Sequence, residues 1–171
     1  VLVIGGGLAA MRAALAAAGT GARTGLMLKG VLGQSGSSAI AGGGLAAVMG
    51  VADVPEDSVE KHFQDTLASG DYVNNPELVR QLVTHAAQAI RELEEMGAQF
   101  VRKNDGEIEV FLAPAHRYRR SVRVAGGGTA RMIEPLTQYL RSQPIEVMER
   151  TSALEILLEG GRAAGVVAVH G

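Results

Sequence analysis

The feature that most constrains the fold is a glycine cluster that directly follows a short apolar run. Residues 1–4 are β-branched or aliphatic, which is typical of a buried parallel strand. Gly5, Gly6 and Gly7 come next, and an alanine-rich segment then runs to Gly19, where a helix is expected to end. Strand, glycine turn and helix in this order, with the spacing G-x-G-x-x-A, predict a dinucleotide-binding unit. A glycine turn required only for packing is the alternative.

Each small residue of this unit has an expected role. Gly5 makes the tight turn, Gly7 lets the backbone approach a pyrophosphate, and Ala10 permits close packing of helix on strand. Leu8 and Ala9 open the helix, whose free N–H groups would hold the pyrophosphate.

The next strand is expected at residues 24–28. An acidic residue that binds ribose hydroxyls is usual near the end of this strand, but the chain has Lys29 and Gly30. Lys29 either indicates a ligand with a phosphorylated ribose or is a solvated charge at the end of the strand.

A second glycine-rich segment, residues 33–47, indicates close approach of backbone to a flat polar ligand. A flexible linker is the alternative, although apolar residues such as Ile40 and Leu45 are unusual in linkers. The candidate cofactor-binding residues of this segment are Ser35, Gly36, Ser37, Ser38, Gly42, Gly43 and Gly44.

Composition narrows the functional classes. The chain has 171 residues, of which 23 are glycine and none is cysteine, and its net charge is −2. Without cysteine, disulfides and Cys-ligated metal or iron–sulfur centres are excluded on this chain. The weak net charge argues against nucleic acid as a partner, and no apolar run reaches the roughly 20 residues of a transmembrane segment.

The remaining pattern predicts an α/β fold: a parallel, Rossmann-like dinucleotide-binding sheet with a helical insertion and a β-hairpin. We expect helices at residues 58–68, 76–96 and 132–141, and a strand at 145–148. Hairpins are expected at residues 100–112 and 153–169.

In these motifs and their order the chain resembles the flavoproteins of fumarate reductase, succinate dehydrogenase and L-aspartate oxidase. The resemblance covers nearly all 171 residues but only the first portion of the longer family chain. It implies FAD as cofactor, and it implies that residues 1–171 are the N-terminal portion of an FAD-binding domain, without the capping domain and C-terminal part. The matching motifs are Lys29-Gly30, Ser35-Gly36-Ser37-Ser38, Gly43-Gly44-Leu45-Ala46-Ala47, His62-Phe63-Gln64-Asp65-Thr66, Gly70-Asp71 and Leu93-Glu94-Glu95-Met96-Gly97.

Three positions depart from the family pattern. Membrane-bound members carry a flavin-linking histidine where Gly36 stands, so we expect non-covalent FAD. The family often has Gln or Glu just before its Gly-Gly pair, where this chain has Gly42. Aspartate oxidases carry an E-G-G-H stretch with a Glu near the substrate amino group, whereas this chain has Ala113-Pro114-Ala115-His116. The missing Gly-Gly pair also leaves the geometry of this loop open.

The resemblance further implies where substrate and cofactor lie. His116 and Arg120 match a region near the dicarboxylate, and Arg pairs bidentately with carboxylates. A solvated basic loop is the alternative. His62 and Asp65 are either hydrogen-bonding residues around the flavin or a helix-surface pair, and Thr151 lies where the family backbone contacts adenine.

The implied function is an FAD-dependent oxidoreductase that interconverts succinate and fumarate. Hydride would pass between flavin N5 and the C4 dicarboxylate, with a proton supplied by the protein. An L-aspartate oxidase-like enzyme and a non-catalytic FAD- or nucleotide-binding fragment are the alternatives. Any iron–sulfur centre must belong to an electron-transfer partner subunit. We expect a cytoplasmic location, or a peripheral one on the cytoplasmic face of a membrane, and no turnover by these 171 residues alone.

Overall fold

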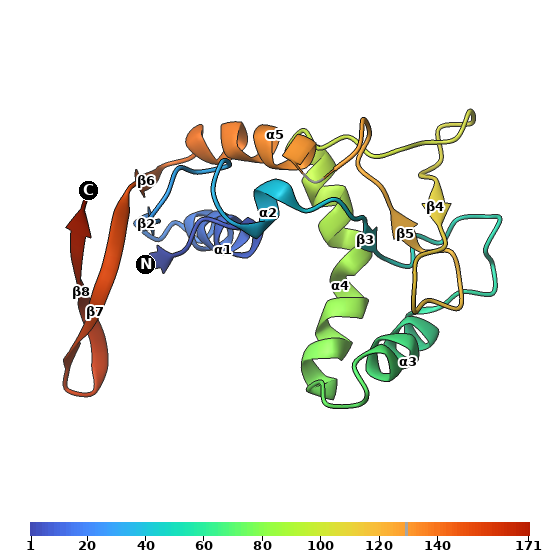
Figure 1. The fold of residues 1–171 in the computed structure, drawn as a ribbon, viewed down its shortest axis with the longest axis horizontal. Coiled ribbons are helices and arrows are strands. Elements are labelled where there is room, and N and C mark those ends of the chain that lie inside the picture. The colour runs from blue at the N-terminus through green and yellow to red at the C-terminus, as the bar shows by residue number, and fades with distance from the viewer. Residues whose placement is uncertain (129) are drawn as a thin grey trace. The chain divides into compact units, whose positions relative to one another are not determined.

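The computed structural model describes residues 1–128 and 130–171, and these form two compact units (Figure 1). The first unit comprises Val1–Ala41 and Ile133–Gly171, and the second comprises Gly42–Met132. The insertion between the two parts of the first unit is thus a compact body of its own.

A parallel sheet forms the centre of the first unit. Its strands are β1 (Leu2–Ile4), β2 (Thr24–Met27) and β6 (Ile145–Met148), in the order β1-β2-β6. β2 lies between two parallel neighbours, so Leu26 pairs with residues on both sides and is fully buried. The three strands expected in this sheet are confirmed, and so is its parallel arrangement.

The first unit also contains helices. α1 (Leu8–Gly19) connects β1 to β2 and packs on both, burying Met11 and Ala14 completely. α5 (Ala130–Arg141) adds buried Leu136 and Leu140 ahead of β6. The short α2 (Ser37–Ile40) lies within the second glycine-rich segment. The first unit therefore has the strand–helix–strand core that the sequence predicts.

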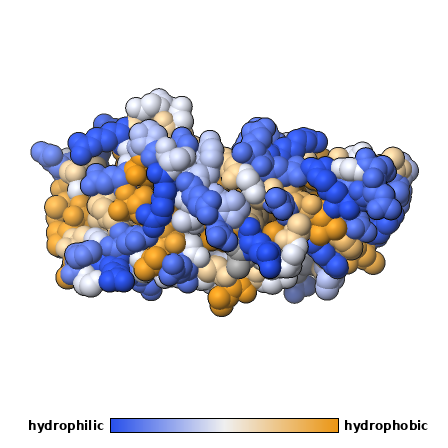
Figure 2. Space-filling model, turned by 90° about the horizontal axis from the view of Figure 1, so that it is seen from above, coloured by the Kyte–Doolittle hydropathy of each residue, from blue (hydrophilic) through white to orange (hydrophobic). Residues whose placement is uncertain are grey.

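A long two-stranded hairpin ends the chain. β7 (Thr151–Glu159) and β8 (Arg162–His170) pair antiparallel around Gly160 and Gly161, both with positive φ. Several apolar side chains on it are exposed, among them Leu154 at 66% and Leu158 at 68%. Apolar and polar side chains are intermingled over the face shown in Figure 2. The predicted hairpin is confirmed.

The second unit contains two helices with clear starts. α3 (Val59–Ser69) begins at Ser58, whose side chain accepts from the Lys61 N–H. α4 (Pro76–Glu95) begins at Asn75, which accepts from two N–H groups of the first turn. The helices pack through Phe63, Val79 and Val83. No helix in the described part of the chain is both long and apolar enough to cross a membrane.

The second unit also contains a small antiparallel sheet. β3 (Leu45–Ala46), β4 (Val110–Phe111) and β5 (Ser121–Val122) are ordered β3-β5-β4. The insertion is therefore not purely helical. The turn of the expected 100–112 hairpin is present, with Arg102 bridged to Ile108, but β4 pairs with β5 instead of extending that hairpin. Val110 and Val122 are register partners in this pairing and are both buried, at 3% and 0% exposure.

Candidate functional site

The glycine cradle (Gly5, Gly6 and Gly7) lies between β1 and α1. Gly5 N donates to Met27 O at 2.8 Å and has φ +137°, a conformation that side chains disfavour. A Cβ added to Gly5 would lie 3.3 Å from Ala10 Cβ. Both conformation and space therefore require glycine at this turn, and Ala10 already leaves little room.

The other two glycines are constrained by their neighbours. A Cβ on Gly6 would lie 2.6 Å from Leu28 Cδ1, and one on Gly7 would lie 3.2 Å from Ser38 Oγ. Gly7 is the N-cap of α1 and has no side chain that could cap the helix. The Leu8 N–H in the first turn donates instead to Ser38 Oγ at 3.2 Å. The first turn of α1 has no acidic residue. The positive end of the helix dipole is thus left for an anion.

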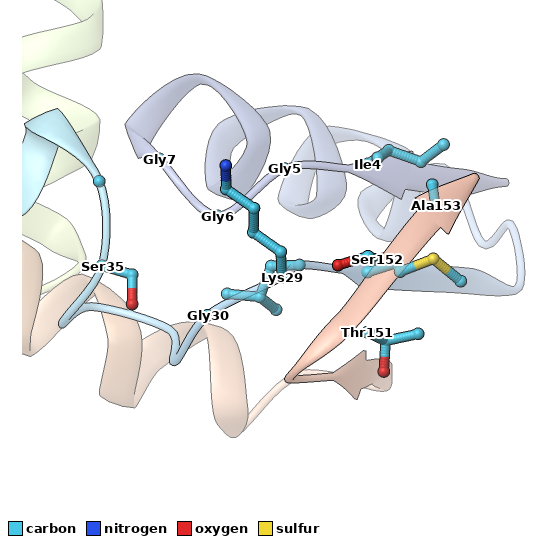
Figure 3. Close-up of a pocket in the computed structure, with 13 residues that line it drawn as sticks. Ile4, Gly5, Gly6, Gly7, Lys29, Gly30, Ser35, Thr151, Ser152 and Ala153 are labelled. Carbon is cyan, nitrogen blue, oxygen red and sulfur yellow. The ribbon is translucent and has the colours of Figure 1, made fainter. Parts of the chain in front are cut away.

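A pocket of about 280 Å³ opens at the carboxyl ends of β1 and β2, beside this cradle (Figure 3). Thr151 N donates to Leu28 O at 2.9 Å, which places the start of β7 along the pocket. The predicted residues that line it are Gly5, Gly7, Lys29, Gly30, Ser35, Gly36 and Thr151. Residues not selected from the sequence also line it: Ile4, Gly6, Met27, Leu28, Ser152 and Ala153.

Lys29 supplies the charge of this pocket. Its exposed side chain extends from the end of β2 toward Gly6 and Gly7 (Figure 3). A cationic side chain and a helix N-terminus together suit a phosphate or pyrophosphate. Glycine backbone, helix end and lysine therefore fit the phosphate-bearing part of a dinucleotide.

The other predicted cofactor residues lie outside this pocket. Leu8, Ala9 and Ala10 form the first turn of α1, Ser37 and Ser38 form the start of α2, and Gly42, Gly43 and Gly44 belong to the second unit. A Cβ on Gly44 would lie 2.6 Å from Val122 O. The structure thus explains Gly44 by the close approach of β3 to β5.

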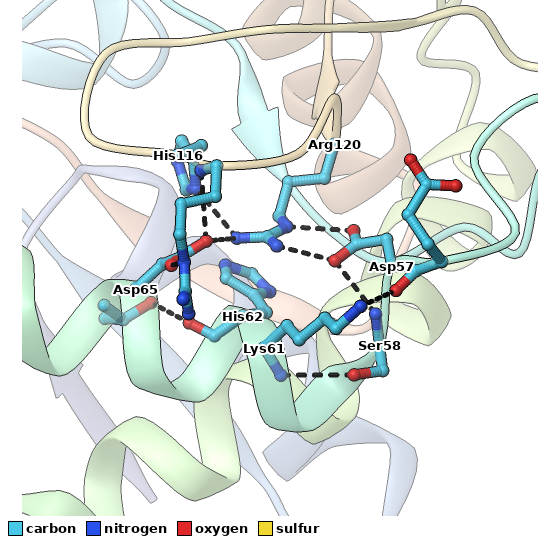
Figure 4. A network of polar contacts seen from close by, with 10 residues as sticks. Asp57, Ser58, Lys61, His62, Asp65, His116 and Arg120 are labelled. Atoms are coloured by element: carbon cyan, nitrogen blue, oxygen red, sulfur yellow. Dashed lines mark hydrogen bonds and ion pairs between the residues drawn. The ribbon is translucent and has the colours of Figure 1, made fainter.

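A buried ion cluster of Asp57, Asp65 and Arg120 forms the centre of the second unit (Figure 4). Arg120 Nε and Nη2 donate to both oxygens of Asp57 at 2.9 and 2.6 Å, and Nη1 donates to Asp65 Oδ2 at 2.7 Å. The three side chains are at most 4% exposed. Asp57 is a site residue that the sequence analysis missed, because no local pattern links it to Arg120.

Arginines shift the pKa of Asp65. Burial by itself would raise this pKa, but hydrogen bonds from Arg120 and Arg117 outweigh it and lower the pKa below 3.8. Burial by itself would lower the pKa of Arg120, but hydrogen bonds to Asp57 and Asp65 raise this pKa further above its ordinary value. Asp65 and Arg120 are therefore both charged at neutral pH.

Two histidines adjoin the ion cluster. Arg120 Nη1 lies 3.1 Å from His116 Nδ1, and the ring centroids of His62 and His116 are 5.7 Å apart. Burial, followed by the charge of Arg120, lowers the pKa of His62 to about 4 and also lowers the pKa of His116. Among the described residues, His62 Nδ1 is a buried atom without a hydrogen-bond partner. Both rings are neutral near pH 7.

A second pocket, of about 340 Å³, borders these histidines. We call it the histidine pocket. Ala115 in its wall has φ +65°, a left-handed conformation that glycine adopts more easily. The loop thus keeps a glycine-like geometry although it carries alanine. The lining residues are Ala46, His62, Asp65, Thr66, Ser69, Gly70, Asn74, Leu82, Pro114, Ala115 and His116.

A parallel sheet, the glycine cradle and a helix N-terminus without a side-chain cap from Gly7 define a dinucleotide-binding α/β domain. The family described as FAD binding domain matches residues 1–171, and the chain belongs to this family. Its cofactor is FAD.

The similar proteins include a flavoprotein subunit and an oxidase by name. The chain is 30% identical over 172 residues to the fumarate reductase flavoprotein subunit of Haemophilus influenzae, covering 99% of this chain and 28% of the relative. It is 37% identical over 171 residues to L-aspartate oxidase of Caulobacter vibrioides, covering 98% and 33%. The solved Mycobacterium smegmatis Sdh1 complex in the apo form matches with a TM-score of 0.90 and 30% identity, covering 99% and 30%. The chain thus spans about a third of the length of these proteins.

Proposed function

We propose that residues 1–171 are the N-terminal, cofactor-binding portion of an FAD-dependent oxidoreductase that interconverts succinate and fumarate. The observation that carries this proposal is the glycine cradle with Lys29 at the carboxyl ends of β1 and β2. The names of the similar proteins support the class of reaction. The capping part that would complete a substrate site belongs, in this proposal, to further polypeptide.

The chain contributes binding and orientation. Bound FAD supplies the two-electron redox chemistry. Gly5, Gly7 and the first turn of α1 would hold the pyrophosphate, Lys29 would offset its charge, and Thr151 would lie beside the adenosine half. Glycine at position 36 offers no side chain for a covalent link, so the cofactor is bound non-covalently.

His116 and Arg120 lie on the substrate side in this proposal. His116 is partly exposed and lines the histidine pocket, whereas Arg120 is 1% exposed and paired with two carboxylates. These positions support a role for His116 in contacting the ligand. They support a role for Arg120 in holding His116 without contacting the ligand itself.

An L-aspartate oxidase-like activity is the second candidate, since a 37% identical relative carries that name. The resemblance places a Glu of aspartate oxidases where this chain has Ala113. Without that carboxylate an ammonium group lacks its natural partner, which favours a dicarboxylate without an amino group.

Electrons would arrive through a partner. The chain has no cysteine and so cannot hold a Cys-ligated iron–sulfur cluster. One similar structure is described as a complex. We therefore propose that the electron-transfer partner is an iron–sulfur protein, and that the two work in the cytoplasm or on the cytoplasmic face of a membrane.

Two experiments test the proposal. Titration of the purified chain with FAD, followed by flavin fluorescence, should saturate, and acid precipitation should release all flavin into the supernatant. The complete gene product should oxidise reduced viologen with fumarate. L-aspartate-dependent oxygen consumption without fumarate reduction would reverse the order of the two candidates, and no saturable flavin binding by the complete gene product would overturn both.

A further inference from the structure

We propose that Arg120 is a positioning residue that fixes His116 as an Nε2–H hydrogen-bond donor, and that His116 rather than Arg120 contacts a substrate carboxylate. The choice of ligand rests on the proposed function. The assignment of the proton on His116 does not, because it follows from the contacts inside the second unit.

The proton on His116 is placed by its neighbour. Arg120 Nη1 lies 3.1 Å from His116 Nδ1, and a guanidinium can donate but cannot accept. Nδ1 is therefore the acceptor. A neutral imidazole carries one proton, so that proton is on Nε2.

All three nitrogens of Arg120 already make contacts inside the second unit. Its Nε and Nη2 donate to Asp57, and its Nη1 is shared between Asp65 and His116. Arg120 is 1% exposed and does not line the histidine pocket, whereas His116 does. A carboxylate that enters this pocket can reach His116 without breaking the ion cluster.

The surroundings keep His116 neutral. The charged or titratable groups that act on it are Arg120, Asp57, Asp65 and, across the ring contact, His62. Burial and the charge of Arg120 outweigh the two carboxylates, so the pKa of His116 lies below 6.5. His116 thus offers a donor without adding a charge, and Asp57 and Asp65 keep Arg120 from attracting the ligand directly.

Nitrogen NMR of the histidines tests the tautomer directly. The uniformly ¹⁵N-labelled full chain has four histidines, which long-range ¹H–¹⁵N spectra separate with the help of a His116→Gln variant. At pH 7.5 we expect His116 to show a protonated Nε2 and an unprotonated Nδ1. A proton on Nδ1, or an imidazolium, would overturn the inference.

Two variants test the positioning role. In Arg120→Lys, one ammonium replaces the three nitrogens that serve Asp57, Asp65 and His116, so His116 should become a mixture of both tautomers. The control Arg119→Lys alters an exposed arginine that pairs with Asp53 and should leave the spectrum unchanged. A folded Arg120→Lys variant with an unchanged tautomer would refute the role of Arg120. If this variant does not fold, the wild-type spectrum still decides the tautomer.

The ligand is tested with succinate and with uncharged succinamide. Succinate added to the FAD-loaded complete gene product should shift the Nε2 resonance of His116 while the Nε resonance of Arg120 stays in place, and succinamide should shift neither. A shift at Arg120 alone, or none at His116, would refute the carboxylate contact. If FAD does not bind but His116 shows the expected tautomer, the proposed function is contradicted and the proton assignment stands.

Discussion

Arg120 and Asp57 are 63 positions apart in the sequence, yet they form a two-point ion pair with side chains 0% and 4% exposed. The guanidinium also binds Asp65 from α3. One arginine thus joins the loop before α3, the helix itself and the segment ahead of β5. Buried ion pairs of this kind are costly to break because the remaining charge has no water to solvate it.

We therefore expect Asp57→Asn to lower the free energy of unfolding of the second unit by about 3–5 kcal/mol. Urea denaturation followed by circular dichroism at pH 7.5 measures this. Asp53→Asn is the matched control, because Asp53 binds Lys103 and Arg119 on the surface, and exposed pairs contribute little. Equal effects of the two substitutions would contradict the central role of the ion cluster.

Stability should fall as the pH drops from 6.5 to about 4. In the folded chain the pKa of His62 is lowered from 6.5 to about 4 by burial and by Arg120. The unfolded chain therefore binds a proton in this window that the folded chain does not, so acid favours unfolding. The lowered pKa of His116 acts in the same direction. Below the ordinary pKa of Asp65, protonation of that carboxylate in the unfolded state adds a further loss.

His62→Gln should make the urea midpoint less dependent on pH between 6.5 and 4. His85→Gln, which alters an exposed histidine on α4, is the control and should keep the wild-type slope. A His62→Gln slope identical to that of the wild type would show that another group governs acid sensitivity.

Ala115→Gly should stabilise the second unit by up to about 1 kcal/mol. Ala115 has φ +65°, and a left-handed backbone costs a residue with a side chain about 1–2 kcal/mol. Part of this gain is lost because glycine has more freedom in the unfolded chain. Thermal unfolding measures the change. Ala13→Gly in α1, where glycine is disfavoured, should instead destabilise the chain.

Gly5→Ala should weaken FAD binding by about fivefold or more. Its φ of +137° and the 3.3 Å approach to Ala10 Cβ both disfavour a side chain, and strain of this type costs about 1–3 kcal/mol. Flavin fluorescence titration gives the dissociation constant. Gly19→Ala, where a Cβ meets no atom within 4 Å, serves as control and should bind FAD like the wild type.

Lys29→Gln should reduce FAD affinity up to about fivefold at low salt, which corresponds to about 1 kcal/mol for an exposed charge. The difference from wild type should shrink as salt rises, because the Debye length falls to about 10 Å at 0.1 M. Titrations at two salt concentrations measure both effects. Arg162→Gln, at the exposed hairpin turn outside the pocket, should change neither.

Local patterns determined the first unit. The glycine cradle and helix α1 were predictable because backbone conformation and close packing act over a few residues, as between Gly5 and Ala10. The parallel strands followed from short apolar runs, and the hairpin of β7 and β8 followed from the Gly160-Gly161 turn. The cofactor-binding role of this unit could likewise be predicted, since glycine spacing controls where backbone N–H groups are free.

Contacts between distant segments were decided by the tertiary structure. The sequence marks Asp57 as part of a helix start and Arg120 as part of a basic stretch, and no short-range rule joins them. The same holds for Ser152 and Ala153, which enter the pocket because β7 starts beside Leu28. The β3-β5-β4 sheet also depended on long-range pairing. A residue's type sets what it can bind, but burial and the folded path of the chain determine which partner it meets.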